Sequence, residues 1–177
     1  LLINGVNIEY RADNGEIKNT NIKLIDFDNI SNNEFVAVNQ LTIIQNEINR
    51  RPDVVLFVNG LPLVVIEIKN AADSKADLSM AYRQIQTYKK QISGLFRFNE
   101  LCVITDGIDA LAGTITSRFE RFMAWKTVDG EVEAGSVPMF DIMIRGMLRP
   151  DVLLDIIKNF TVYERDDKGE SKFIKKV

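Results

Sequence analysis

The chain has 177 residues, of which 46% are hydrophobic and 27% charged, and its formal net charge is −3. Length and composition are typical of one globular domain, or of one domain and the start of another. The absence of histidine excludes imidazole-based catalytic triads and histidine-ligated zinc, and the single cysteine excludes an internal disulfide. Any chemistry must therefore rest on carboxylates, lysine, tyrosine or a hard metal ion with oxygen ligands.

No apolar run reaches the roughly 18 to 20 residues that a membrane-spanning helix needs, and no signal-peptide pattern opens the chain. We therefore expect a cytoplasmic protein without a membrane partner. Neither a GxxxxGK[ST] phosphate loop nor a GxGxxG dinucleotide motif is present, so no nucleotide site is expected within the chain. The acidic balance is unlike the basic surface that a self-sufficient nucleic-acid-binding domain usually carries.

Hydrophobic periodicity and turn residues predict an order of strands and helices along the chain. Apart from the hairpin considered next, strands are expected at 3–10, 16–25, 35–44 and 101–105, with shorter strand candidates at 114–116 and 122–125. Helices are expected at about 76–92, 139–148 and 151–159. The first two strands form a hairpin that turns at Asp13-Asn14-Gly15, and the last two helices are separated at Arg149-Pro150.

The sequence RPDVVLFVNGLPLVVIEIK, residues 51–69, predicts a buried hairpin of two apolar strands. The dipeptide Asn59-Gly60 between two Val/Ile/Leu-rich runs is a strong hairpin signal, because both residues tolerate positive φ. The run 61–68 is apolar enough to be buried on both faces of a sheet. The charges of Glu67 and Lys69 at its end are therefore costly unless they are paired or bound to a cation.

Strand register decides whether the acids of this hairpin act together. Glu67 and Lys69 share one face because side chains alternate along a strand. A two-residue loop would place Asp53 opposite Ile66, on the other face, whereas a three-residue loop, 58–60, places Asp53 opposite Val65 and on the same face. We predict the three-residue loop.

Asp53, Glu67 and Lys69 together are suited to phosphodiester hydrolysis. Two carboxylates on one face can hold Mg²⁺, and the backbone carbonyl of Ile68 can supply another oxygen. The ion polarises a phosphoryl oxygen and lowers the pKa of bound water, and the Lys69 ammonium can orient the attacking water. The competing interpretation is that Asp53 caps a strand while Glu67 and Lys69 form a solvated strand end.

Longer motifs resemble a known family. The segments NNEFVAVNQLTI, RRPDVVLFVNGLPLVVIEIKN and RQIQTYKKQI, continuing through LCVITDGIDALAGTITSRFERFMAWKTVDG, are similar to the N-terminal endonuclease domain of the R (restriction) subunit of type I restriction-modification enzymes. The resemblance implies the PD-(D/E)xK nuclease fold, an α/β fold with a central mixed β-sheet flanked by helices. It assigns the catalytic positions to Asp53, Glu67 and Lys69, in agreement with the metal ligands expected above, Asp53, Glu67 and the carbonyl of Ile68.

The family's Gln-x-x-x-Tyr element falls on Gln84 and Tyr88, four residues apart and hence neighbours on one helix edge. The resemblance implies that they lie beside the cleavage centre and support the DNA or the metal site. Tyr88 also falls on the apolar stripe of its helix, so a buried tyrosine with a satisfied hydroxyl is an equal alternative.

The same resemblance divides the chain into a nuclease domain, 1–128, and a linker with a helical segment, 129–177, that leads to an ATP-dependent translocase not contained in this chain. It implies Mg²⁺-dependent cleavage of unmodified foreign double-stranded DNA, with ATP needed by the full-length protein and with methyltransferase and specificity subunits as partners. Two alternatives stay open: a repair or junction-resolving nuclease of the same fold, and a catalytically inactive interaction or scaffold module.

Overall fold

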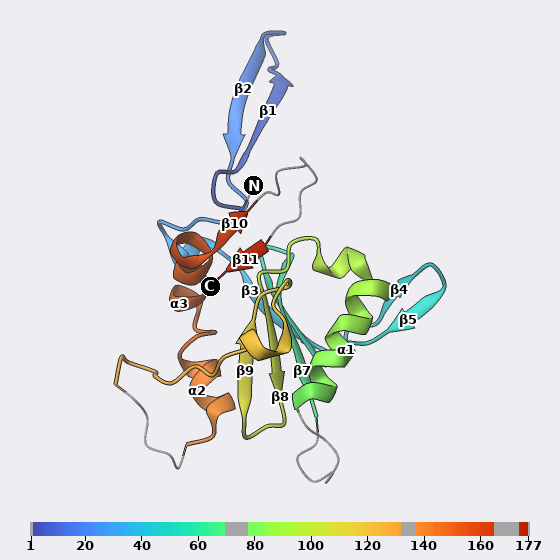
Figure 1. The fold of residues 1–177 in the computed structure, drawn as a ribbon. Helices are drawn as coiled ribbons and strands as arrows, with labels where there is room; N and C mark the ends of the chain where they lie inside the picture. The colour runs from blue at the N-terminus through green and yellow to red at the C-terminus, as the bar shows by residue number, and fades with distance from the viewer. Residues whose placement is uncertain (1, 70–77, 132–136, 165–173, 177) are drawn as a thin grey trace.

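A mixed β-sheet forms the centre of the molecule (Figure 1). The computed structural model describes residues 2–69, 78–131, 137–164 and 174–176. Within these residues the central sheet comprises β3 (Phe35–Asn39), β6 (Val54–Val58), β7 (Leu61–Ile68), β8 (Leu101–Thr105) and β9 (Ala110–Gly113), in the order β3-β6-β7-β8-β9. Only the β7–β8 pair is parallel among these strands. The predicted α/β class with a central mixed sheet is confirmed.

Helices cover both faces of this sheet (Figure 1). The helical elements are η1 (Ile30–Asn32), α1 (Leu78–Gln91), η2 (Ser93–Phe96), η3 (Phe119–Arg121), α2 (Met139–Arg145), α3 (Pro150–Asp155) and the π-helix η4 (Ile156–Phe160). Helix α1 packs on the face that carries Val55 and Val65. Helices α2, α3 and η4 pack on the opposite face, which carries Val64 and Ile66. The alternation of these β7 residues between two cores explains why β7 is apolar from Leu61 to Ile66.

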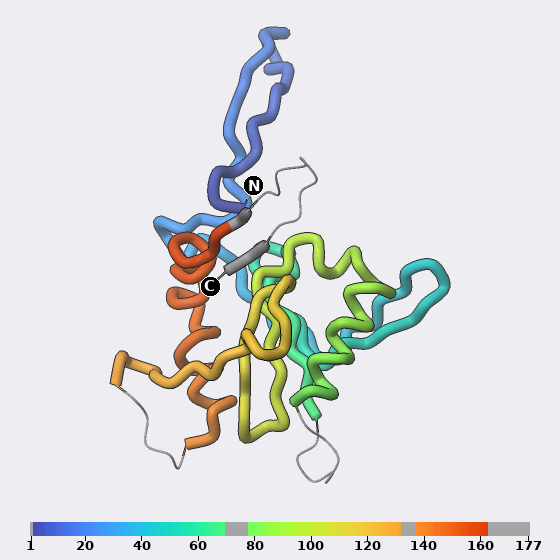
Figure 2. The backbone as a smooth tube through the Cα atoms, in the orientation of Figure 1, coloured from blue at the N-terminus to red at the C-terminus, as the bar shows by residue number. Residues whose placement is uncertain are grey.

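In the described ranges, three hairpins lie outside the central sheet. They are formed by β1 (Val6–Arg11) with β2 (Ile17–Ile22), β4 (Ile43–Gln45) with β5 (Ile48–Arg50), and β10 (Val162–Glu164) with β11 (Ile174–Lys176). The β1–β2 hairpin extends away from the rest of the chain (Figures 1 and 2). The β4–β5 hairpin lies beside α1, where the Arg50 guanidinium donates to the Gln91 side chain at 2.5 Å.

The hairpin of β6 and β7 corrects the predicted loop. Val58 pairs with Leu61, so the connection is the two-residue turn Asn59-Gly60, with φ of +50° and +77°. The three-residue loop was wrong. The extra residue lies instead within β7, because Leu56 pairs with Val64 while the next residue of β6 already pairs with Pro62. Leu63 is thus the extra residue of a β-bulge, and its carbonyl accepts the Glu100 backbone N–H at 2.7 Å.

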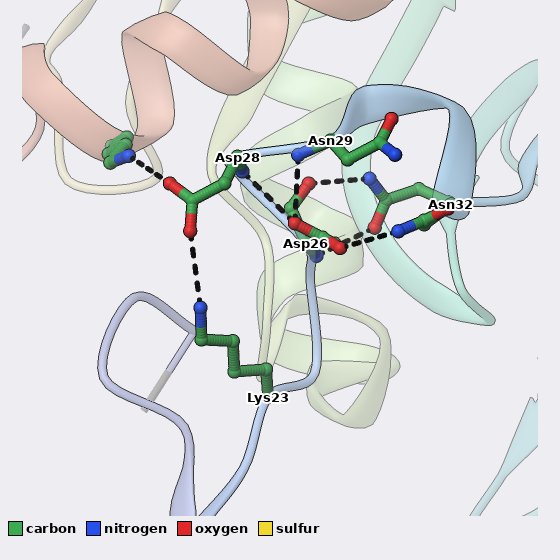
Figure 3. Close-up of polar contacts among 7 residues, drawn as sticks. Lys23, Asp26, Asp28, Asn29 and Asn32 are labelled. Carbon is green, nitrogen blue, oxygen red and sulfur yellow. Dashed lines mark hydrogen bonds and ion pairs between the residues drawn. The ribbon is translucent and has the colours of Figure 1, made fainter.

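The loop that precedes β3 is held by a polar network (Figure 3). The Asp26 carboxylate accepts the backbone N–H groups of Asp28 and Asn29 at 3.0 and 2.9 Å. Asp28 in turn forms ion pairs with Lys23 at 3.2 Å and with Lys158 of η4 at 3.1 Å. The contact with Lys158 fixes the loop against η4, on the face of the sheet that α2, α3 and η4 cover.

Asn59 ties the same loop to the turn of the central hairpin. Its side-chain nitrogen donates to the Leu24 carbonyl at 2.9 Å and to the Asn33 side chain at 2.8 Å. Its side-chain oxygen accepts the Glu34 backbone N–H at 2.8 Å. Asn59 therefore serves both the left-handed turn and the packing of a separate segment.

Other expectations from the sequence meet mixed outcomes. The first hairpin, the strand 101–105 and the paired helices near Pro150 are confirmed. The expected strand 35–44 is interrupted at Gln40, whose φ is +52°, and continues as β4 in a separate hairpin. The candidates 114–116 and 122–125 are not strands; β9 precedes them, and Met123 contributes one isolated bridge to Ala112. The start of the helix expected at 76 falls outside the described residues, and α1 is described from Leu78.

No helix within the described residues is long and apolar enough to cross a membrane. The boundary at 128/129 stays a prediction, although the helices beyond it bury their apolar side chains against the same sheet.

Candidate functional site

An open cleft of about 420 Å³ lies where β3 ends, β6 begins and β7 ends. Its lining comprises Asn39, Gln40, Asp53, Val54, Ile68 and Lys69. Three members of the predicted site, Asp53, Ile68 and Lys69, are among these residues. The cleft thus lies at the end of the buried strand β7, where the sequence predicts charged side chains.

Asp53 is partly buried at the start of β6, directly after the buried Pro52. Its Oδ1 accepts a hydrogen bond from Gln40 Nε2 at 2.7 Å, and its Oδ2 accepts the backbone N–H of Ile68 at 2.8 Å. Two neighbouring strands thus hold the carboxylate. Because a carboxylate has about four acceptor positions, Asp53 keeps acceptor capacity for a further ligand.

Glu67 is the buried acid of the site, with only 3% of its surface exposed. Its Oε1 accepts Lys69 Nζ at 2.8 Å, while its Oε2 is buried without a hydrogen-bond partner among the described residues. Burial raises the pKa of Glu67; the Lys69 hydrogen bond opposes this shift, and the charge of Asp53 adds to it. A buried carboxylate oxygen without a donor is costly in free energy unless something binds it.

The register explains how Asp53 and Glu67 come together. Val55 pairs with Val65 and Val54 with Ile66, so continuing the ladder by one residue sets Asp53 opposite Glu67. The expectation that the acids share a face is met, although Asp53 lies opposite Glu67 rather than Val65. The extra residue that brings the two acids onto one face is therefore Leu63 in the bulge, and not a third residue in the turn.

Tyr88 lies in the core and also borders the site. It is 4% exposed and packs in the α1 core, and its hydroxyl donates to the Arg51 carbonyl at 3.4 Å. Burial, with a further contribution from the Glu67 charge, raises the pKa of Tyr88 to about 12. Gln84 lies one turn earlier on α1, partly buried, and its side chain lowers the pKa of Tyr88 through a hydrogen bond. Their supporting role in catalysis stays a prediction.

The donor set can be compared with what Mg²⁺ requires. No group of three or more His, Cys, Asp or Glu side chains that could hold a metal ion occurs in the described part of the chain. The two acids fit a hard divalent ion nonetheless, since Mg²⁺ usually takes one or two carboxylates and fills its other positions with water and substrate oxygens. The unpartnered Glu67 Oε2 is the atom that supports this fit. The Ile68 carbonyl as a third ligand stays a prediction.

Gln40 is the site residue that sequence reasoning missed. It stands between an apolar strand and a second hydrophobic run, so its pattern predicts a continuing strand. The left-handed backbone conformation that turns its amide toward Asp53 leaves no mark in the hydrophobic pattern. The end of β3 before Gln40 is visible only in the structure, so the sequence carries no signal that marks this residue.

The fold and the cleft define an α/β protein with two acids and a lysine at one end of the inner strands β6 and β7. Comparisons with known proteins then identify the family. Residues 1–121 match the family described as "Type I restriction enzyme R protein N terminus", and the chain belongs to that family.

Similar proteins carry names that are consistent with this family. The chain is 44% identical over 181 residues to the type I restriction enzyme HindI endonuclease subunit of Haemophilus influenzae, a match that covers 100% of this chain and 17% of the relative. It is 31% identical over 185 residues to a putative type I restriction enzyme MjaIXP endonuclease subunit of Methanocaldococcus jannaschii, covering 93% of this chain and 18% of the relative. The chain thus spans less than a fifth of the length of these relatives.

Proposed function

We propose that this chain is the nuclease module of a type I restriction R subunit and has the PD-(D/E)xK fold. It would hydrolyse phosphodiester bonds of unmodified foreign double-stranded DNA with Mg²⁺ in the cytoplasm. The observation that carries the proposal is Glu67: a buried acid with one oxygen that has no partner among the described residues, facing Asp53 and paired with Lys69 beside an open cleft. The family comparison supports this assignment over a repair or junction-resolving nuclease.

Asp53 and Glu67, with the Ile68 carbonyl, would hold the metal ion. When bound, Mg²⁺ supplies Lewis-acid polarisation of a phosphoryl oxygen and lowers the pKa of a coordinated water. Lys69, which is held by Glu67 Oε1 at 2.8 Å, places a cation where negative charge develops on the phosphoryl group. Attack of water on phosphorus would break one P–O ester bond and leave a phosphate and a hydroxyl end. Gln84 and Tyr88 would support Glu67 from α1.

The partners follow from the same proposal. DNA translocation would come from an ATP-driven motor outside this chain, and recognition from specificity and methyltransferase subunits. The net charge of −3 is consistent with a module that relies on the rest of a complex for its grip on DNA.

Calorimetric titration with Mn²⁺ and Mg²⁺ tests the metal centre. We expect the wild-type chain to bind, and Asp53→Ala and Glu67→Ala to lose binding while their circular dichroism spectra stay unchanged. Asp13→Ala is the matched control, because Asp13 is an exposed acid in the turn of the β1–β2 hairpin. Metal binding is the first readout because the isolated chain lacks the motor that the proposal assigns to cleavage.

A second titration in the presence of a short DNA duplex separates the remaining outcomes. Binding only with duplex supports a site that the substrate completes. A wild-type chain that binds no metal with or without duplex would contradict the nuclease proposal and leave the inactive scaffold.

A further inference from the structure

We propose that Gln40 is a positioning residue, which holds the Asp53 carboxylate in the orientation that metal binding needs. The inference rests on the proposed function and extends it to a residue outside the predicted site. Gln40 follows β3 directly, and Asp53 precedes β6 directly. Between them the chain leaves the central sheet to form the β4–β5 hairpin and then returns.

Two hydrogen bonds join Gln40 to Asp53 at the base of this excursion. The backbone N–H of Gln40 donates to the Asp53 carbonyl at 2.8 Å, and Gln40 Nε2 donates to Asp53 Oδ1 at 2.7 Å. The backbone bond closes the ends of the excursion, while the side-chain bond acts on the carboxylate itself. One residue therefore fixes both the backbone and the side chain of the acid.

The backbone of Gln40 is in the left-handed region, with φ of +52°. Few residues other than glycine adopt this region, because Cβ approaches the carbonyl oxygen there. Strained conformations of this kind cluster at functional sites, where the surrounding structure maintains them. At Gln40 the strained conformation accompanies an amide that donates to the acid, and a glycine would relieve the strain without supplying that amide.

The chemistry of the amide suits this role. Ile68 N–H donates to Asp53 Oδ2 at 2.8 Å from the opposite side, so each oxygen of the carboxylate has one fixed donor. Both donors are neutral, and neither adds a positive charge that competes with a metal ion for Asp53. A group that hydrogen-bonds to a metal-binding carboxylate holds that carboxylate in the orientation for coordination. Loss of such a partner typically lowers metal affinity about 10- to 100-fold.

The test compares Gln40→Gly with a matched control, Gln45→Ala, in the same 177-residue chain. Gln45 also uses its amide, which donates to Ser93 Oγ and accepts the Gly94 backbone N–H, but it is not among the cleft residues. Mn²⁺ affinity is measured by calorimetry and stability by urea unfolding. We expect Gln40→Gly to lose about 10- to 100-fold in Mn²⁺ affinity without loss of stability. Gln45→Ala should keep the affinity and lose stability.

A purely structural role for Gln40 predicts the opposite pattern. If Gln40→Gly binds Mn²⁺ as the wild type does, the inference is overturned even though the proposed function stands. If the wild type binds no Mn²⁺ with or without a short DNA duplex, the proposed function fails, and the role of Gln40 in holding the Asp53 carboxylate is decided by a double-mutant cycle of Gln40→Gly and Asp53→Ala in urea unfolding. Additive effects in that cycle would show that the two side chains are not coupled.

Discussion

Glu67 is the side chain of the site whose burial costs the most electrostatic free energy, because a buried carboxylate loses its hydration. It ends a strand that is buried on both faces, and its neighbours on that strand are apolar. Within the described part of the chain Lys69 compensates one oxygen only, so this carboxylate is poorly satisfied there. Active sites retain such groups because the same desolvation strengthens their interaction with a charged ligand. If Glu67 binds the metal ion as proposed, its function is therefore opposed to stability.

The raised pKa of Glu67 gives a pH dependence of known sign. The folded state holds the Glu67 proton more tightly than the unfolded chain, so between the ordinary glutamate pKa of about 4.3 and the raised value, stability falls as pH rises. Glu67→Gln has no proton to lose there. We expect urea unfolding without metal to show a pH-dependent loss in the wild type that is absent from Glu67→Gln.

The control for that comparison is Glu47→Gln, since Glu47 is an exposed acid in the β4–β5 turn. It should follow the wild-type pH profile. Parallel profiles for the wild type and Glu67→Gln would show that Glu67 titrates normally.

At the scale of elements, the β6–β7 hairpin is the unit on which the site depends. Its turn needs two residues with positive φ, and Asn59 also hydrogen-bonds to three groups of the loop that precedes β3. Gly60 has φ of +77°, and a Cβ there would meet no atom within 4 Å. The cost of any side chain at Gly60 is therefore one of backbone conformation alone.

Gly60→Ala and Gly15→Ala form a matched pair, because Gly15 has φ of +84° and is equally free of neighbours in the β1–β2 turn. The local penalty should be the same, about 1 to 2 kcal/mol. We expect Gly60→Ala to lose that amount in global urea unfolding, because the hairpin belongs to the core. Gly15→Ala should change global unfolding by less than about 0.5 kcal/mol. Equal losses would show that the β1–β2 hairpin unfolds together with the sheet.

The sequence allowed this hairpin to be predicted, but not the position of its irregularity. Because thirteen residues separate Asp53 from Glu67, the requirement that they share a face demands one odd residue, either in the turn or in a bulge. It does not say where the odd residue lies. A bulge at Leu63 satisfies this requirement as well as a three-residue loop does, and its carbonyl is used by Glu100, far along the chain. Long-range hydrogen bonds of this kind are not encoded in local periodicity.

Gln40 shows a second limit of the same kind. Its segment has strand periodicity on both sides, and the break depends on hydrogen bonds to Asp53, thirteen residues away. By contrast, α1 was predicted well because its apolar stripe, which includes Ala81, Ile85 and Tyr88, is local and regular. An element such as α1 was thus predictable because its apolar residues recur at a regular local spacing and pack against one core.

At the scale of the whole molecule, stability is unevenly distributed. Strands β7 and β8 are buried at the centre of the sheet between two layers of helices. The β1–β2 hairpin extends outward, and its residues are mostly exposed, including Ile17 at 64%. A two-stranded hairpin without a covering layer is marginally stable in water. We therefore expect the central sheet to be stable and the β1–β2 hairpin to contribute little to the free energy of unfolding.

Amide hydrogen exchange measures this difference directly. We expect β7 and β8 amides to exchange only through global unfolding, whereas β1 and β2 amides exchange through local opening. For an ordinary stability of 5 kcal/mol or more, the two rates should differ by roughly a thousandfold or more. The comparison is made by mass spectrometry on peptides from each segment. Slow exchange in β1 and β2 would instead reveal that another surface covers this hairpin.

The bulge at Leu63 has a consequence for insertions and deletions. Asp53 and Glu67 are separated by thirteen residues with the bulge, and a regular hairpin with the same two-residue turn would set them opposite each other with twelve. A one-residue length change in β7 can therefore be absorbed without moving either acid to the other face of the sheet. Motif searches that fix the interval between these acids at one length will overlook chains that build the same site with another.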